Sequence, residues 1–254
     1  MRDGLITAPL HRFSAYSLLH LPPPFYTLWS MRACIAIIVA LGLLFPIEVF
    51  SQAVRTSSSF KIARLKYSGG GDWYNDPQEE TNLLKFVRQN TFIDVEPVYE
   101  FVDVTSEKFF TYPFVFLTGH GNMTFTDLEV KRIRTYLENG GFIYADDDYG
   151  MDKAFRREIK KVFPDQELIE LPFSFGLYHA QYDFSKGPPK THEHDGKPAQ
   201  GFGLFHNGKL VLYYTYESNP SDGWNDPEVH GDSPEKREEA FRFGTNIVVW
   251  ALTH

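Results

Sequence analysis

The sequence predicts an α/β fold of three layers, with helices on both faces of a mostly parallel sheet and an antiparallel hairpin at the end of that sheet. The first observation is the segment 113–148, where an apolar run ends at the glycine-flanked His120, an amphipathic stretch follows, and a second apolar run ends in three aspartates. Strand, loop, helix and strand in this order form the unit of a parallel sheet. The second observation is Asn207-Gly208 between two apolar runs, a strong signal for a hairpin turn.

The first half of the chain alternates between strand and helix patterns. Residues 60–67 alternate apolar and polar side chains, which predicts a strand, and residues 79–89 place Leu83, Leu84 and Val87 on one helical face. The other elements predicted here are a strand at 93–102, a strand at 112–118, a helix capped at 126 and ended by 139–141, a strand at 142–145 and a helix at 152–162.

The helix that follows residue 126 has the clearest boundaries. Thr126 with Glu129 three residues later matches a capping box, and Asn139-Gly140-Gly141 is a typical helix stop. The residues expected on its inner face are Leu128, Ile133, Tyr136 and Leu137.

The second half of the chain is less regular at first. Residues 165–200 form a polar excursion, and the hairpin is predicted over 203–216. A loop at 218–232 then leads to a final helix at 234–252, whose apolar face we expect to pack on the sheet.

Residues 31–53 read as a secretory signal peptide. A basic start, an apolar run from Ile35 to Phe45 and the small residues Ser51 and Ala53 match its three parts, so cleavage is expected after Ala53. The apolar run is shorter than the roughly 20 residues of a membrane span, although an uncleaved anchor is the alternative. We therefore predict export to the periplasm or outside the cell, with no stable membrane span after cleavage.

The signal also divides the chain. Residues 1–30 are interpreted as a mis-called extension before a true start at Met31, the alternative being an unusually long basic region. Residues 54–59 are a polar linker, and residues 60–254 are predicted to form one α/β domain.

Composition excludes several classes of function. The formal net charge is −8 without a basic patch, so no nucleic-acid partner is expected. The only cysteine, Cys34, lies inside the signal. The exported domain would therefore have no disulfide, no cysteine nucleophile and no thiolate metal site.

The strand ends supply the candidate catalytic residues. In parallel sheets, ligands bind where the carboxyl ends of strands meet, which favours a site at Asp146, Asp147, Asp148 and His120. If the protein is an enzyme, Asp147, Asp148 and His120 would act as nucleophile or general base. Asp146 and Asp148 could hold a hard divalent metal. The alternative is a helix cap beside a solvated aspartate.

Two similar segments suggest a binding surface. Residues 72–77 (Asp-Trp-Tyr-Asn-Asp-Pro) resemble residues 222–227 (Asp-Gly-Trp-Asn-Asp-Pro), and both follow predicted strands. They would form an aromatic rim suited to sugars or peptides, or else turns whose tryptophans fill the edge of the core. The expected ligand-binding residues are Trp73, Tyr74, Trp224, Asp226 and, reaching the cleft from elsewhere, His179.

A His-Glu-His run at 192–194 is the other metal-like pattern. Histidines two residues apart could bind zinc, but no third ligand follows at a known spacing, and the surrounding prolines and lysines favour a solvated loop. No cofactor is identified from the sequence beyond a divalent metal at one of these places.

Several segments together resemble a known family. The 113–148 unit, Leu-Pro-Phe-Ser-Phe-Gly-Leu-Tyr-His at 171–179, the hairpin ending in Tyr-Glu-Ser, and Phe-Gly-Thr-Asn-Ile-Val at 243–248 are similar to the domain of unknown function family numbered 4159. The resemblance covers about residues 60–252. It implies kinship with class I glutamine amidotransferase-like domains and hence a flavodoxin-like sandwich, but likeness of fold does not transfer function. Where amidotransferases have a nucleophilic cysteine after a strand, this chain has aspartates.

Two functions remain open at this stage. The first is a non-catalytic binding or scaffold domain that recognises a carbohydrate, a peptide or an envelope protein through its aromatic rim. The alternative is a hydrolase that uses the strand-end aspartates with a histidine, assisted by a metal or not. A carboxylate of Asp146, Asp147 or Asp148 within about 5 Å of a histidine ring, inside a sizeable pocket, would favour the enzyme, whereas aspartates that point into solvent would favour the binding domain.

Overall fold

The computed structural model describes residues 59–192 and 194–254, which belong to one compact unit. The signal peptide, the preceding extension and all but the last residue of the linker lie outside the described residues. Within the described part of the chain, no helix is both long and apolar enough to cross a membrane.

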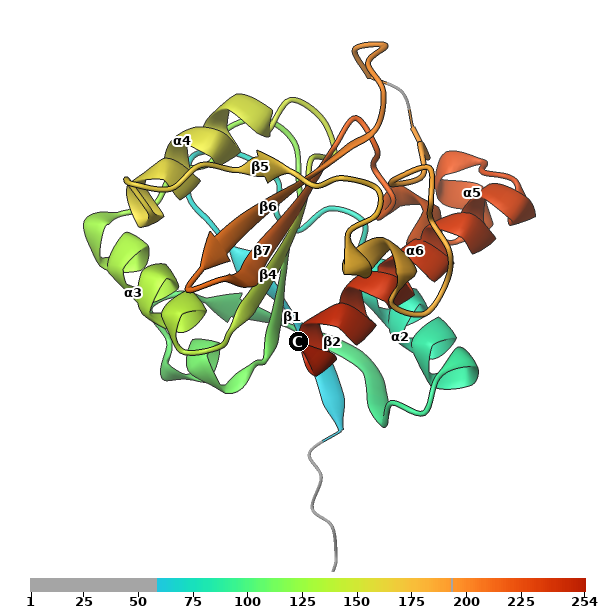
Figure 1. Ribbon diagram of the computed structural model, residues 1–254, viewed down its shortest axis with the longest axis horizontal. Coiled ribbons are helices and arrows are strands. Elements are labelled where there is room, and N and C mark those ends of the chain that lie inside the picture. The colour runs from blue at the N-terminus through green and yellow to red at the C-terminus, as the bar shows by residue number, and fades with distance from the viewer. Residues whose placement is uncertain (1–58, 193) are drawn as a thin grey trace, which may run out of the picture. The chain divides into compact units, whose positions relative to one another are not determined.

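A seven-stranded sheet forms the centre of the domain, in the order β2-β1-β3-β4-β7-β6-β5. Figure 1 shows it between two groups of helices. The strands are β1 (Phe60–Lys66), β2 (Val95–Asp103), β3 (Phe114–Leu117), β4 (Phe142–Asp146), β5 (Ile169–Glu170), β6 (Gln200–His206) and β7 (Lys209–Tyr216).

The first five strands of this order are parallel, and β6 and β5 continue the sheet in antiparallel fashion. The order β2-β1-β3-β4-β7 matches the flavodoxin-like arrangement. In this arrangement β2 is added on one side of β1 and the later strands are added on the other side, so the switch point of the sheet lies between β1 and β3. The predicted hairpin is confirmed. Asn207 and Gly208 both have positive φ, as the tight turn between β6 and β7 requires.

Helices cover both faces of the sheet, which confirms the three-layer prediction. On one face lie α3 (Asp127–Glu138) and α4 (Asp152–Val162), and on the other α2 (Glu79–Asn90) and α6 (Pro234–Thr253). Successive residues of β3 alternate between the two cores: Phe114 and Phe116 face α2 and α6, while Val115 and Leu117 face α3 and α4. A short helix, α5 (Pro227–His230), precedes α6.

The differences from the predicted elements are local. Leu128 is exposed and Val130 is buried instead, because Leu128 lies five residues before Ile133 and therefore on another side of the helix. The short strand β5 and the 3-10 turns were not predicted. These turns are η1 (Glu107–Thr111), η2 (Gly176–His179) and η3 (Asp222–Trp224).

Candidate functional site

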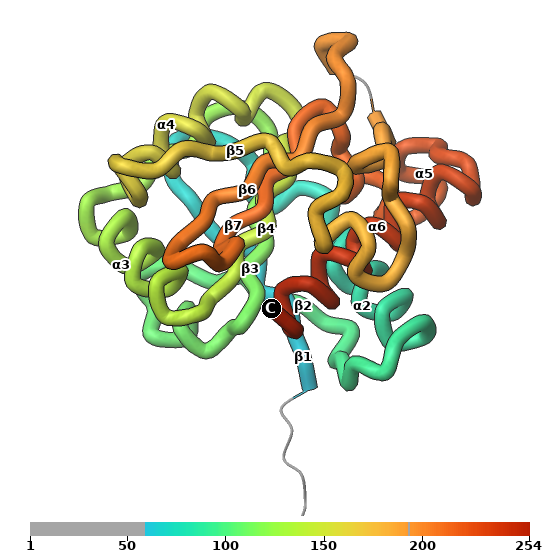
Figure 2. Tube along the Cα trace, viewed as in Figure 1, coloured from blue at the N-terminus to red at the C-terminus, as the bar shows by residue number. Residues whose placement is uncertain are grey.

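The carboxyl ends of the parallel strands meet at one edge of the sheet, the upper edge in Figure 2. Asp72 follows β1, His120 follows β3, Asp148 follows β4 and Asn219 follows β7. Asp72 and His120 thus flank the switch point between β1 and β3, where ligands bind in folds of this type.

His120 is held between two carboxylates. Its backbone N–H donates to Asp72 Oδ1 at 2.6 Å, and its ring Nδ1 lies 3.1 Å from Asp72 Oδ2 and 3.2 Å from Asp148 Oδ2. The His120 side chain is 47% exposed, whereas that of Asp148 is 4% exposed. Among the described residues no hydrogen-bond partner faces Nε2, so this nitrogen is free to meet a ligand.

Gly119 explains how His120 reaches this position. Its φ of +136° lies in a region that side chains rarely adopt, and a Cβ there would come 2.3 Å from the Tyr67 hydroxyl and 3.2 Å from Asp72 Oδ1. Only glycine allows the backbone at this position to approach the loop that follows β1 this closely.

The three strand-end aspartates point to different partners. Asp146 accepts hydrogen bonds from the Thr215 hydroxyl at 2.5 Å and the Ser221 amide at 2.9 Å. Asp147 accepts from the Met151 amide at 2.8 Å, just before helix α4. Burial raises the pKa of Asp146 to about 7 and that of Asp147 to about 6.

Asp148 is the aspartate that joins the network of site residues. Its carboxylate accepts hydrogen bonds from Asn219 Nδ2 at 3.0 Å and from Asn75 Nδ2. Asn219, Glu217 and Asp76 all have positive φ, which is uncommon in residues other than glycine. Backbone of this kind gathers at functional sites, where surrounding contacts hold it in place.

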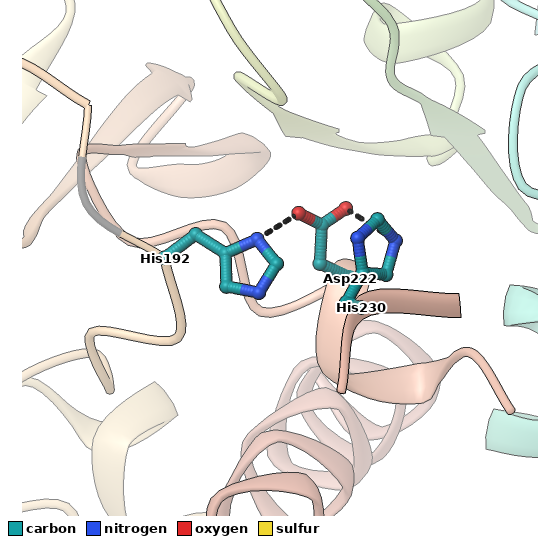
Figure 3. A group of neighbouring side chains, drawn as sticks. All are labelled: His192, Asp222 and His230. Atoms are coloured by element: carbon teal, nitrogen blue, oxygen red, sulfur yellow. Dashed lines mark ion pairs between the residues drawn. The ribbon is translucent and has the colours of Figure 1, made fainter. Parts of the chain in front are cut away.

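A second group of side chains surrounds Asp222 (Figure 3). His192 Nδ1 lies 2.5 Å from Asp222 Oδ2, and His230 Nε2 lies 3.6 Å from Asp222 Oδ1. We call His192, Asp222 and His230 the histidine cluster. Burial raises the pKa of Asp222 to about 6, while its hydrogen bond to His192 acts in the opposite direction and raises the pKa of that histidine.

Asn219 connects the two groups, because its Nδ2 lies 3.0 Å from Asp148 Oδ1 and 2.6 Å from Asp222 Oδ2. His120, Asp148, Asn219 and the histidine cluster therefore form one continuous polar network. Two sets in the described residues have ligand atoms close enough to hold a metal: the histidine cluster, and Asp76 with Glu79 and Asp222. Asp146 and Asp148, the pair expected from the sequence, belong to neither set, and both Asp146 oxygens are occupied by protein donors.

A cavity of about 450 Å³ opens beside this network. Its lining residues are Asp147, Tyr149, Gly150, Asp152, Lys153, His194, Asp195, Lys197, Tyr216 and Glu217. Tyr149 links the cavity to His120, since its carbonyl accepts from the Gly121 amide at 3.0 Å. A larger hollow of about 810 Å³ lies between residues 182–190 and the start of α6, and none of the network residues lines it.

The expected aromatic rim is reduced in the structure. The Trp224 ring is 1% exposed, packs near Phe116 and Tyr144, and donates its N–H to the Ala240 carbonyl, so it fills the core and offers no surface to a ligand. Trp73 and Tyr74 stay near the surface with their rings 5.3 Å apart, and Tyr74 is 61% exposed.

The two other expected ligand-binding residues have local partners. Asp226 accepts from Asn82 Nδ2 at 2.9 Å at the start of α5. His179 uses both ring nitrogens nearby, 2.8 Å from Asp183 Oδ1 and 2.9 Å from the Phe173 carbonyl oxygen, so the cleft position expected for it is not observed.

Sequence reasoning missed several residues of the network. They are Asp72, Asn75, Asn219, Asp222 and His230. One signal pointed toward them: the two similar segments 72–77 and 222–227 do lie side by side, since carboxylate oxygens of Asp76 and Asp222 lie within 4.8 Å of one another. The carboxylates and amides of these two segments meet at the site, and their tryptophans do not.

Comparison with known proteins agrees with the resemblance seen in the sequence. No curated protein matches the chain. The model of the family described as domain of unknown function DUF4159 matches residues 61–252, which is most of the chain, and the protein therefore belongs to that family.

Proposed function

We propose that the protein is a hydrolase in which His120 acts as the general base. The observation that carries this proposal is the position of His120 Nδ1, 3.1 Å from Asp72 Oδ2 and 3.2 Å from Asp148 Oδ2 at the switch point of the sheet. Two carboxylates on one ring nitrogen favour a proton on Nδ1, which leaves the lone pair of Nε2 for chemistry. A strand-end aspartate thus lies well within 5 Å of a histidine ring.

The reaction would proceed by general-base catalysis. Nε2 of His120 accepts a proton from water as the water oxygen bonds to the electrophilic carbon of the substrate. The imidazolium, stabilised by Asp72 and Asp148, then returns the proton to the leaving group as its bond to that carbon breaks. The neighbouring cavity beside Asp147 and Tyr149 would hold the rest of the substrate.

The charge of the site indicates a substrate class. Asp72, Asp76, Asp148 and Asp222 lie in one network, and anionic substrates would be repelled by them. We therefore propose an ester or amide bond in an uncharged substrate. The exported location predicted from residues 31–53 would place such a substrate outside the cytoplasm. The likeness to amidotransferases concerns the fold, because the only cysteine is Cys34.

The test uses p-nitrophenyl acetate, p-nitrophenyl butyrate and p-nitrophenyl phosphate as probes. The wild-type chain should hydrolyse the carboxylic esters but not the phosphate, and His120→Gln should lower the rate by about 10²–10⁴-fold. Asp148→Asn should lower it as well, because Nδ1 loses one acceptor.

Activated esters also react slowly with any accessible imidazole, so His206→Gln is the matched control. His206 lies at the end of β6, where its ring Nε2 is 2.9 Å from Asn207 Nδ2 and its ring packs near Phe163. Its variant should keep the full rate. Equal rates in His120→Gln and His206→Gln would sink the proposal.

A second candidate is the binding domain of the sequence hypothesis, favoured by the aromatic side chains near β2. Trp73 lies 5.1 Å from Phe101, and Lys66 Nζ is 5.5 Å from the Trp73 ring. Tyr74 and Phe101 are 61% and 42% exposed. Aromatic faces of this kind bind sugars or peptides. Glycan-array binding lost in Trp73→Ala and kept in His120→Gln would favour this candidate.

A further inference from the structure

The histidine cluster has the composition and shape of a metal site. His192 comes from the 165–200 excursion, Asp222 from η3 and His230 from the end of α5, yet their ligand atoms all lie within 4.8 Å of one another. Figure 3 shows the Asp222 carboxylate between the two imidazoles. We propose that these three residues bind one divalent transition-metal ion, with zinc as the preferred metal. This proposal goes beyond the hydrolase and does not depend on it.

An unpaired buried oxygen supplies independent support. Asp222 is 3% exposed, and its Oδ1 has no hydrogen-bond partner among the described residues. The ring nitrogen Nε2 of His230, at 3.6 Å from this oxygen, is too distant for a hydrogen bond. A buried carboxylate oxygen without a donor is costly, and a metal ion would satisfy it. Asn225, which is 1% exposed and lies beside His230, also has an unpaired Oδ1.

The distances suit ligands that share an ion. With metal–ligand bonds of about 2.0–2.1 Å, two ligands of a tetrahedral zinc lie about 3.3–3.4 Å apart. His230 Nε2 lies 3.6 Å from Asp222 Oδ1 and 3.6 Å from Asp76 Oδ1, close to that separation. Asp76 or a water molecule would complete the coordination. His192 Nδ1, at 2.5 Å from Asp222 Oδ2, would have to release its proton and move away slightly as the ion enters.

The surroundings of His192 match a metal-binding histidine. Its other ring nitrogen, Nε2, lies 3.1 Å from Asp232 Oδ2, and Lys236 Nζ lies 3.1 Å from Asp232 Oδ1. Metal-ligating histidines usually donate their second N–H to a carboxylate in this way, which fixes the tautomer and aims the remaining nitrogen at the ion. Here Nδ1 is the nitrogen aimed at the cluster.

The ligand types select the metal. Two imidazoles with one or two carboxylates suit zinc and similar ions, whereas Mg²⁺ and Ca²⁺ prefer oxygen ligands alone. Zinc should therefore bind in the presence of a large excess of Mg²⁺. The competing explanation is a hydrogen-bonded His192–Asp222 ion pair that holds two loops together without any ion.

The experiment measures metal binding by the full chain without a substrate, so it can succeed or fail independently of the hydrolase. After treatment with a chelator, the wild-type protein is titrated with Zn²⁺ in a calorimeter in excess Mg²⁺, and the bound metal is counted by mass spectrometry. We expect one zinc ion per chain. His230→Ala should weaken binding by more than tenfold, and Asp232→Asn by about tenfold because His192 loses its orienting partner. His206→Gln should bind as wild type does.

A second measurement guards against variants that fail to fold. Co²⁺ is substituted for zinc in the wild-type protein. Strong visible absorption bands, typical of four- or five-coordinate cobalt with nitrogen ligands, would support the site. Circular dichroism confirms that each variant is folded before its titration. The absence of stoichiometric zinc binding by the wild type, or zinc binding unchanged in a folded His230→Ala protein, would overturn the proposal in favour of the metal-free ion pair.

Discussion

Asn219 is the residue through which the two halves of the site are joined. It is fully buried, has a φ of +50°, and its Nδ2 lies within 3.3 Å of acceptor atoms of Asp148, Asp222 and His194. An amide nitrogen has only two hydrogens, so it cannot bond all of these acceptors at once. A ligand that binds Asp148 or Asp222 would therefore compete with Asn219 for these acceptors.

Asp147 gives a prediction about pH. Burial raises its folded-state pKa to about 6 from an ordinary value of 3.8, so the folded protein holds this proton more tightly than the unfolded chain. The stabilisation from protonated Asp147 is present below pH 4 and is lost as pH rises through about 6. Asp147→Asn keeps an oxygen that can accept the hydrogen bond from the Met151 amide, but its side chain no longer gains or loses a proton in this pH range. Relative to wild type, the variant should gain up to about 3 kcal/mol of unfolding free energy between pH 4 and pH 7.

Urea denaturation at a series of pH values measures this difference. Asp103→Asn is a control in which the pH dependence should have the opposite sign, because hydrogen bonds from Thr105 lower the pKa of Asp103. That variant should lose stability at neutral pH, and the loss should fade as pH falls below 4. Parallel pH profiles for wild type and Asp147→Asn would contradict the first prediction.

At the scale of elements, Arg64 ties strand β1 to helix α2 and to the loop between them. Its guanidinium contacts Glu80 Oε1 at 2.5 Å and Glu79 Oε2 at 2.7 Å, with all three side chains fully buried. It also donates to the backbone carbonyls of Asn75 and Asp76. The loop that presents these two residues to the site therefore depends on one buried cation.

Arg64→Met should destabilise the protein by about 3–5 kcal/mol, because it leaves two buried carboxylates without their partner. Equilibrium urea unfolding would measure the change. Lys66→Met, on the same strand but half-buried, is the matched control and should cost less than about 1 kcal/mol. Adding Glu79→Gln and Glu80→Gln to Arg64→Met should restore part of the loss. Equal effects of the two single variants would contradict the role given to Arg64.

The elements also show what periodic patterns can predict. The buried face of α2 was predicted correctly at Leu83, Leu84 and Val87, because apolar residues at helical spacing face the core. The capping box at Thr126 and Glu129 is formed as predicted. Strand β5, in contrast, has two residues that are both exposed, so no apolar pattern announces it.

For the whole molecule, the sheet was predictable and most of the site was not. The ends of the predicted parallel strands indicated which edge of the sheet carries the site, and His120 and Asp148 do meet there. Their partners Asp72 and Asn219 come from irregular loops, Asp222 comes from the 3-10 turn η3, and His230 ends the short helix α5. Their positions depend on contacts between segments that are distant in sequence, and the local spacing of apolar residues does not indicate such contacts. Trp224 was expected either to bind a ligand at the rim or to fill the edge of the core, and the structure shows the second, with the ring packed near Phe116 and Tyr144.

The pairing of β4 with β7 has a consequence for the order in which the domain folds. Tyr144 pairs with Tyr213, although helix α4 and the whole 165–200 excursion lie between them in sequence. β1 to β4 precede β7 in the chain, so the edge of β4 stays open until β7 pairs with it and α6 covers one face. Closing so long a loop is slow, so amides of β3 should gain protection before those of β7 in pulsed hydrogen exchange during refolding. Simultaneous protection would argue against this order. Chaperones or proteases that recognise open strand edges would therefore act on this chain mainly before β7 has paired with β4.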